Sequence, residues 1–259
     1  MNYVEELFSV KDRRVVVTGA TSGIGFMIAE GFVKAGAVTT LVSRKAAALE
    51  EVVSELSQHG RCDYIAADVS TQDGCLAVAE ALKERADAVH ILVNAAGCTW
   101  GAPIRQYPDK AWDKVLDLNV RGVFNLTVAC MDLLLAASTP EHLARVINVG
   151  SVHGNAAPEW ESYAYSASKA AVHHLTVHLA KRLGRDGILV NAIAPGPFPS
   201  KMMDALLQVE GDKLRGETAT GRLGEPNDMA GVALYLASRA SNNVTGAIIP
   251  VDGGYVTTR

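Results

Sequence analysis

The segment "RRVVVTGATSGIG" (residues 13–25) decides how this chain folds. Its valine-rich first half is typical of a strand that is buried on both faces of a sheet. Gly19, Gly23 and Gly25 then allow a tight turn in which backbone N–H groups can approach a phosphate closely. The spacing is not G-x-G-x-x-G, but a glycine-rich turn between a buried strand and a helix indicates nucleotide binding. A plain strand-to-helix turn is the alternative.

The same alternation of apolar runs and amphipathic stretches continues along the chain. It predicts the α/β class, with one doubly wound, Rossmann-type parallel sheet of seven strands and helices on both faces. No linker or repeat interrupts the pattern, so we expect a single dinucleotide-binding and catalytic domain over residues 1–259. The further strands are expected at 37–43, 62–69, 89–97, 145–151, 187–196 and 246–254, and helices at 24–35, 45–58, 72–86, 110–136 and 165–183.

The longest segment between predicted strands follows the sixth strand. Its first part, residues 197–225, begins with prolines and then carries a short apolar helix face. Because it follows the carboxyl end of a strand, we predict a substrate lid there. A surface helix that only packs on the domain is the alternative. The apolar face consists of Met202, Met203, Leu206 and Leu207.

Composition excludes several classes of function. The net charge of −4 gives no basic excess for binding nucleic acid or an anionic membrane. The four cysteines lack C-x-x-C spacing and are typical of reduced thiols. The N-terminus lacks a basic n-region, and no apolar run is long enough to span a bilayer. We therefore predict a cytoplasmic protein without nucleic-acid or membrane partners.

The stretch "ESYAYSASKAAVHH" (161–174) contains two tyrosines and one lysine. Residues four apart share a helix face, so Tyr165 and Lys169 lie together while Tyr163 points elsewhere. A phenol beside an ammonium has its anionic form favoured, which suits an acid or base near neutral pH. A chance surface pair is the alternative.

Histidines on the same predicted helix could form half of a metal site. His174 and His178 are four residues apart, but no third ligand accompanies them. His173 beside them indicates a polar helix face. We therefore predict no metal.

Seven short motifs stand in order along the chain: T-G-x-x-x-G-I-G after the first strand, "NAAG" (94–97), "LNVRG" (118–122), "NVGS" (148–151), Y-x-x-x-K, "NAIAPG" (191–196) and "VDGG" (251–254). Together they resemble the short-chain dehydrogenase/reductase family, and the match covers essentially the whole chain. The resemblance implies an oxidoreductase that interconverts a ketone and an alcohol. The segments "NAIAPGPFPSKM" (191–202) and "GRLGEPNDMAGVALYLAS" (221–238) are similar to the 3-oxoacyl-ACP reductases of this family, including a relative linked to rhamnolipid synthesis.

The resemblance implies four catalytic residues. Tyr165 would donate a proton to the carbonyl oxygen in reduction or remove it from the alcohol in oxidation. Lys169 would stabilise the phenolate and bind the nicotinamide ribose. Ser151 would hold the substrate oxygen, and Asn119 would anchor a water chain through Lys169. Tyr163 would pack or line the pocket wall. Since a non-catalytic NADP-binding relative would typically lack one of the four, their presence favours an enzyme.

The end of the second predicted strand indicates which cofactor binds, because it faces the adenosine ribose. Ser43, Arg44 and Lys45 stand there, with no acid before Glu50. An arginine pairs with a 2′-phosphate, whereas an acid would repel it, so we predict NADP(H). Basic residues that merely flank a solvated helix are the alternative. The resemblance extends the cofactor contacts to Gly19, Thr21, Ser22, Gly23, Ile24, Gly25, Asp68, Val69, Asn94, Ala95, Gly97, Tyr165, Lys169, Pro195, Gly196 and Ser200, which replaces the family's usual threonine.

The substrate is expected to be hydrophobic, because the candidate lid is apolar. We predict a 3-oxoacyl thioester or similar ketone, with a polyol, sugar or hydroxysteroid as the alternative.

Trp112 follows a helical pattern and is expected in the core. In the family, helices matching 110–136 and 165–183 form subunit contacts, which predicts a homo-tetramer, or a dimer. The predicted substrate-contacting residues are Ser151, His153, Trp100, Trp160, Phe198 and Met202.

Overall fold

One parallel sheet forms the centre of the protein. The computed structural model describes residues 2–200 and 203–258. All strand pairs are parallel, in the order β3-β2-β1-β4-β5-β6-β7, which confirms the predicted seven-stranded doubly wound sheet. The strands are β1 (Arg14–Thr18), β2 (Val38–Ser43), β3 (Cys62–Ala66), β4 (Ile91–Asn94), β5 (Ala144–Val149), β6 (Ile188–Pro195) and β7 (Ile248–Val251).

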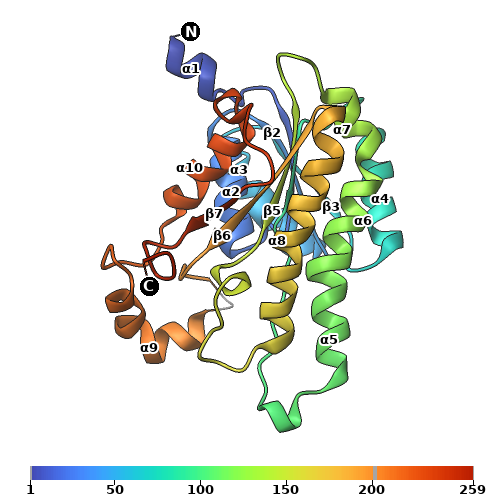
Figure 1. Ribbon diagram of the computed structural model, residues 1–259. Coiled ribbons are helices and arrows are strands. Elements are labelled where there is room, and N and C mark those ends of the chain that lie inside the picture. The colour runs from blue at the N-terminus through green and yellow to red at the C-terminus, as the bar shows by residue number, and fades with distance from the viewer. Residues whose placement is uncertain (1, 201–202, 259) are drawn as a thin grey trace.

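Helices cover both faces of this sheet (Figure 1). One layer contains α2 (Gly23–Lys34), α3 (Ala46–Leu56) and α10 (Pro226–Ala237). The opposite layer contains α4 (Gln72–Lys83), α6 (Gly122–Ala129), α7 (Met131–Ala137) and α8 (Tyr163–Leu183). The remaining helices are α1 (Tyr3–Phe8), α5 (Asp109–Leu116) and α9 (Asp204–Glu217), and Figure 1 shows α9 set apart from both layers.

The central strands are largely apolar because both of their faces are buried, whereas the edge strands β3 and β7 are only partly buried. Every residue of β5 and β6 is buried. On one face, Phe32 of α2 packs in a core with Leu41 of β2, and on the other Leu126 of α6 packs with Leu92 of β4. No single helix of the described chain is long and apolar enough to cross a membrane. The stretch from Asp109 to Ala129 meets that test only together with α7, to which it is bent by 56°.

The long helix predicted over 110–136 is not continuous. A π turn, η2 (Asp117–Arg121), separates α5 from α6, and the N–H of Gly122 bonds to the carbonyl of Asp117. The helical path continues through this turn to Ala129, and the break lies at Cys130, between α6 and α7. A π turn contains one residue more than an α-helical turn. The sequence pattern does not reveal this extra residue, because the apolar face of the helix continues after it. The π turn holds Asn119 in the interior, where it is buried.

A chain of amide and hydroxyl side chains joins β4, β5 and α8 beneath the carboxyl ends of the strands. Asn94 donates to Asn148 (2.9 Å) and to Thr127 (3.2 Å), and Asn148 donates to Thr176 (2.9 Å). All four side chains are buried. Each hydrogen bond therefore satisfies a group that water cannot reach.

We expect Asn148→Ala to lower the free energy of unfolding by about 2–4 kcal/mol, because it leaves buried groups of Asn94 and Thr176 without partners. Urea unfolding followed by circular dichroism measures this change. The exposed Asn243→Ala is the control and should shift stability little. A loss for Asn148→Ala no larger than that of the control would contradict the assignment.

Candidate active site

A cavity of about 660 Å³ opens where β1, β4, β5 and β6 end. The strand order reverses there, so the loops of neighbouring strands diverge and leave a crevice. Among the predicted site residues, its wall contains Gly19, Ser22, Gly23, Ile24, Gly25, Ala95, Gly97, Ser151, His153, Trp160, Tyr165, Lys169, Pro195, Gly196, Phe198 and Ser200.

Other predicted site residues lie outside this wall. Met202 lies outside the described residues, as does the side chain of Leu206. Asn94 belongs to the buried amide chain beneath the cavity rather than to its surface. Trp100 stacks under the ammonium groups of Lys110 and Lys114 instead of lining the pocket. The remaining residues outside the wall are Thr21, Ser43, Arg44, Lys45, Asp68, Val69 and Asn119.

The glycine-rich turn forms a cradle at one end of the cavity. Gly19 has a φ of +67°, and a Cβ there would stand 2.7 Å from Cα of Ala96. A Cβ on Gly25 would stand 2.4 Å from the carbonyl oxygen of Gly19. The N-terminus of α2 has no side-chain cap from Ser22, so its first N–H groups can bind an anion. These features fit the phosphates of a dinucleotide.

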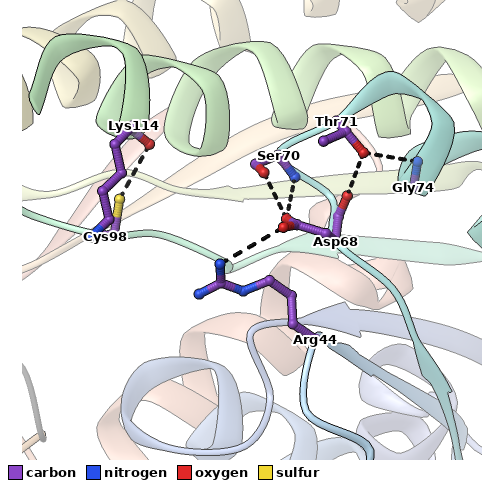
Figure 2. A network of polar contacts seen from close by, with 7 residues as sticks. All are labelled: Arg44, Asp68, Ser70, Thr71, Gly74, Cys98 and Lys114. Carbon is purple, nitrogen blue, oxygen red and sulfur yellow. Dashed lines mark hydrogen bonds and ion pairs between the residues drawn. The ribbon is translucent and has the colours of Figure 1, made fainter. Parts of the chain in front are cut away.

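A polar network lies where β2 and β3 end (Figure 2). A guanidinium nitrogen of Arg44 lies 3.8 Å from Oδ2 of Asp68. The other carboxylate oxygen, Oδ1, accepts from the backbone and hydroxyl of Ser70 (3.0 and 2.7 Å). Burial tends to raise the pKa of Asp68, but the Ser70 hydrogen bonds and Arg44 lower it overall. Asp68 is therefore an anionic anchor that orients the exposed Arg44.

Three side chains of α8, spaced four residues apart, contact the end of β5. The phenol of Tyr165 interacts with the side chain of Ser151, which tends to lower its pKa. The ammonium of Lys169 donates to the carbonyl of Val149 (2.8 Å), and His173 Nε2 accepts from the N–H of Ser151 (3.5 Å). The spacing puts all three on one helix face. The structure thus brings Ser151, Tyr165 and Lys169 together as predicted.

Burial controls the ionisation of this cluster. It raises the pKa of Tyr165, and the interaction with Ser151 only partly opposes this. The Lys169 ammonium lies 5.6 Å from the centroid of the Tyr165 ring. The pKa of Tyr165 therefore shifts opposite to the direction expected from the Tyr165–Lys169 pair. Burial also lowers the pKa of Lys169 to about 8.

Asn119 reaches the cluster indirectly. Its amide accepts from the N–H of Cys98 (2.9 Å) and donates to the Cys98 carbonyl (3.0 Å) and to Ser168 (2.9 Å). The Cys98 thiol also contacts the carbonyl of Lys114, as Figure 2 shows (3.5 Å). Asn119 therefore fixes the loop after β4 against α8.

The other aromatic predictions have mixed outcomes. Tyr163 donates to Glu161 (2.8 Å) and packs edge-on against Tyr107, so it packs outside the cavity. Trp160 lines the cavity and contacts His153 edge-on. The prediction that Trp112 is a core residue is wrong, because its side chain is 37% exposed.

Several lining residues were not singled out from the sequence. Val209, Glu210 and Leu214 of α9 and Tyr255 after β7 complete the wall. The carboxylate of Asp252 accepts from three backbone N–H groups of residues 254–257, which orders the turn that carries Tyr255. The signal for Tyr255 was its place directly after a strand that ends at the cavity.

The histidines of α8 differ from expectation in one respect. His174 and His178 are exposed, but His173 is only 7% exposed, so the predicted polar face at His173 is wrong. Within residues 2–200 and 203–258, no group of three or more His, Cys, Asp and Glu residues could hold a metal ion.

Known oxidoreductases are similar to this chain along nearly its whole length. A family model described as enoyl-(acyl carrier protein) reductase matches residues 19–256. The rhamnolipids biosynthesis 3-oxoacyl-[acyl-carrier-protein] reductase of Pseudomonas aeruginosa is 43% identical over 251 residues, covering 96% of this chain and 98% of that protein. Gluconate 5-dehydrogenase of Gluconobacter oxydans is 33% identical over 252 residues, covering 96% of each.

A solved structure shares the same architecture. The Pseudomonas aeruginosa RhlG/NADP active-site complex superposes with a TM-score of 0.93 at 42% identity. The match covers 96% of this chain and 98% of that one. The similarity therefore extends over nearly the whole chain.

The lowered pKa of Lys169 predicts a pH dependence of stability. Its folded pKa of about 8 lies below the ordinary value of 10.5, so the unfolded chain binds more protons between these values. The free energy of unfolding of the wild type, minus that of Lys169→Met, should therefore increase by about 1 kcal/mol between about pH 7 and about pH 9. Urea unfolding at both pH values measures the difference, with the exposed Lys34→Met as control. A difference that stays constant or shrinks would contradict the prediction.

Proposed function

The chain belongs to the short-chain dehydrogenase/reductase family, and we propose that it is an NADP(H)-dependent oxidoreductase that interconverts a ketone and a secondary alcohol. One observation carries this proposal. The Tyr165–Ser151–Lys169 cluster lies in the same cavity as the glycine-rich cradle at the N-terminus of α2. A proton donor and a dinucleotide-binding end in one cavity suit hydride-transfer chemistry.

Each residue of the cluster has a role in this proposal. When bound, NADP(H) would supply or accept the hydride. Tyr165 donates its proton to the substrate oxygen during reduction, and its raised pKa keeps it protonated near neutral pH. Ser151 donates a hydrogen bond to the same oxygen and so stabilises the charge that develops on it. Lys169 uses one N–H on Val149, which leaves others for a ribose hydroxyl. Asn119 positions the loop after β4.

The substrate in this proposal is a 3-oxoacyl thioester or a similar hydrophobic ketone. The cavity has a largely apolar wall, which favours an alkyl or acyl chain over a polyol. The similarity to a 3-oxoacyl-ACP reductase agrees with this choice, whereas the similarity to a gluconate dehydrogenase supports the polyol alternative. The apolar lining residues are Val152, Trp160, Phe198, Met203, Val209, Leu214 and Tyr255.

We further propose that residues 197–225 form the substrate lid, with α9 as its helix. Val209 and Leu214 contribute to the cavity wall from α9, and Val209 is 81% exposed. Lys213 joins α9 to Glu159, the neighbour of the cavity residue Trp160, through an ion pair of 2.7 Å. Both side chains of this pair are exposed, so the pair itself contributes little to holding α9 in place.

The experiment that tests the function follows NADPH oxidation with a panel of ketones. Acetoacetyl and longer 3-oxoacyl thioesters are compared with sugar and polyol-derived ketones. Turnover that increases with acyl length supports the proposed substrate, and turnover of sugar-derived ketones alone contradicts it. Tight NADPH binding without turnover of any ketone would favour a non-catalytic NADP-binding protein.

We expect Tyr165→Phe to lower kcat by about 10²-fold or more, because it removes only the transferable proton. Its affinity for NADPH should stay within about threefold of wild type. The matched control is Tyr163→Phe, two residues away and outside the cavity, which should keep most of the rate. Steady-state assays compare the two variants. If the phenotypes were exchanged, the tyrosine assignment would be wrong.

The preference for NADP(H) rests on Arg44. Its guanidinium is 66% exposed and is oriented by Asp68 at the end of β2, where a 2′-phosphate would stand. Ser43 and Lys45 flank it with a hydroxyl and a second positive charge. The NADP complex of a similar protein agrees with this choice.

Arg44→Asp should weaken NADPH binding by about 10- to 100-fold and NADH binding much less, because it replaces a charge-assisted contact with repulsion. Dissociation constants from fluorescence titration with both cofactors measure this. Arg185→Asp, at an exposed position in the turn after α8, is the control for net charge. Tighter binding of NADH than of NADPH by the unmodified protein would overturn the proposal.

We also propose that the chain forms a homo-tetramer, or at least a two-fold dimer, through α6 and α8. Phe124 and Val128 on α6 are 44% and 47% exposed, and Val177 on α8 is 46% exposed. Exposed apolar side chains on adjacent helices are typical of a self-complementary interface. A cytoplasmic location stays a prediction from the sequence.

Light scattering at micromolar concentration should give the mass of four chains. Phe124→Lys should reduce this mass, because it buries a charge in the proposed interface. Val209→Lys, at an exposed apolar position on α9, is the control and should leave the mass unchanged. A monomer mass for the unmodified protein would contradict the assembly.

A further inference from the structure

His173 is a buried histidine whose two ring nitrogens both have partners. It lies one helical turn beyond Lys169 on α8 and is 7% exposed. Its Nε2 accepts from the N–H of Ser151 at 3.5 Å, and its Nδ1 lies 3.0 Å from Oδ1 of Asn155. Because Nε2 is the acceptor, the proton of the neutral ring is on Nδ1 and is donated to Asn155.

The N–H of Ser151 depends on this side chain for its hydrogen bond. β5 ends at Val149, and the N–H of Gly150 still bonds to the carbonyl of Ile193 in β6 (2.8 Å). The next N–H, that of Ser151, turns toward α8 and meets His173. A buried N–H without a partner is costly, so His173 determines where the Ser151 backbone can lie.

The ring is enclosed by two glycines on either side of Ser151. A Cβ on Gly150 would stand 2.2 Å from Nε2 of His173, and a Cβ on Gly154 would stand 2.7 Å from Cε1. Any larger residue at either position would displace the ring or the turn. The turn at residues 150–154 therefore needs glycine at both positions in order to pack against the His173 ring.

The ionisation state of the ring agrees with its role as acceptor. Burial and the charge of Lys169 lower the pKa of His173 to about 4. The ring is thus neutral at physiological pH, which leaves Nε2 free to accept.

We propose that His173 is a positioning residue that sets the Ser151 hydroxyl toward the reacting oxygen by holding the Ser151 backbone. This inference rests on the proposed function, in which Ser151 contacts that oxygen. The fixed peptide plane orients the Cα–Cβ bond of Ser151. Its Oγ then accepts from the N–H of His153 (3.2 Å) and interacts with the phenol of Tyr165. His173 itself does not line the cavity, so it would act only through Ser151.

Three substitutions distinguish the hydrogen bond made by Nε2 of His173 from the one made by Nδ1. The amide of His173→Gln reaches the position of Nε2 and can accept from Ser151, whereas that of His173→Asn reaches only the position of Nδ1. His173→Leu keeps bulk and removes both contacts. We expect kcat to fall about 10- to 100-fold for Leu and Asn, with KM and NADPH affinity within about threefold of wild type, and Gln to restore most of kcat.

The neighbouring His174→Gln is the control, because His174 is exposed on the same helix. A Leu variant with kcat within about twofold of wild type would overturn the proposal. So would equal losses for Gln and Asn, a comparison that holds even if the Leu variant does not fold.

A double-mutant cycle with Ser151→Ala tests whether His173 acts through Ser151. The effect of His173→Asn on kcat should disappear in the Ser151→Ala background, and full additivity would contradict the proposal. Histidine nitrogen NMR adds a readout independent of activity. We expect a neutral His173 with the proton on Nδ1 at about pH 7, and a proton on Nε2 would overturn the contact. Wild-type protein inactive on every ketone would contradict the proposed function alone.

Discussion

Side chains at four-residue intervals along α8 bond to the last groups of β5, and this contact holds the candidate active site together. Lys169 donates to the carbonyl of Val149, His173 accepts from the N–H of Ser151, and Tyr165 interacts with the Ser151 side chain. Beyond its last ladder bond a strand leaves unpaired backbone groups, and burying them requires partners. The helix supplies those partners from the same face that carries the proposed acid. The geometry of the site is therefore a consequence of completing the strand.

The same burial determines which groups carry protons. Taking Tyr165, Lys169 and His173 out of water disfavours their charged forms, which raises the first pKa and lowers the other two. A protonated phenol suits the proposed role of Tyr165 as proton donor, and a neutral imidazole suits the proposed role of His173 as hydrogen-bond acceptor. By contrast, Arg44 and Asp68 meet outside the cavity wall, on side chains that are largely exposed to solvent, where a charged phosphate could be bound with little desolvation.

Sequence reasoning succeeded where the signal is local. The buried strands, the glycine-rich turn and the Tyr165–Lys169 spacing each reflect a periodic or short-range constraint. Sequence reasoning failed where an inserted residue, or the position of a residue around a helix axis, decides which way a side chain points. The π turn at Asp117–Arg121 has no signature in the hydrophobic period, and Trp112 lies on a helix whose outer side is open. His173 was assigned to a polar face because its neighbours His174 and His178 are polar, yet a 100° rotation per residue places it inward.

The sequence by itself determined the seven-stranded parallel sheet, the glycine-rich turn and the set of candidate catalytic residues. Each of these depends on residues that are close together in the sequence, through their pattern of burial or their backbone freedom. The tertiary structure alone decided which of these residues meet. Trp160 enters the cavity while Trp100 packs under two lysines, and Tyr255 arrives from the far end of the chain. Such contacts depend on loop paths and on the exact register between α8 and β5, which long-range packing fixes. That packing also decides which buried groups lose their charge.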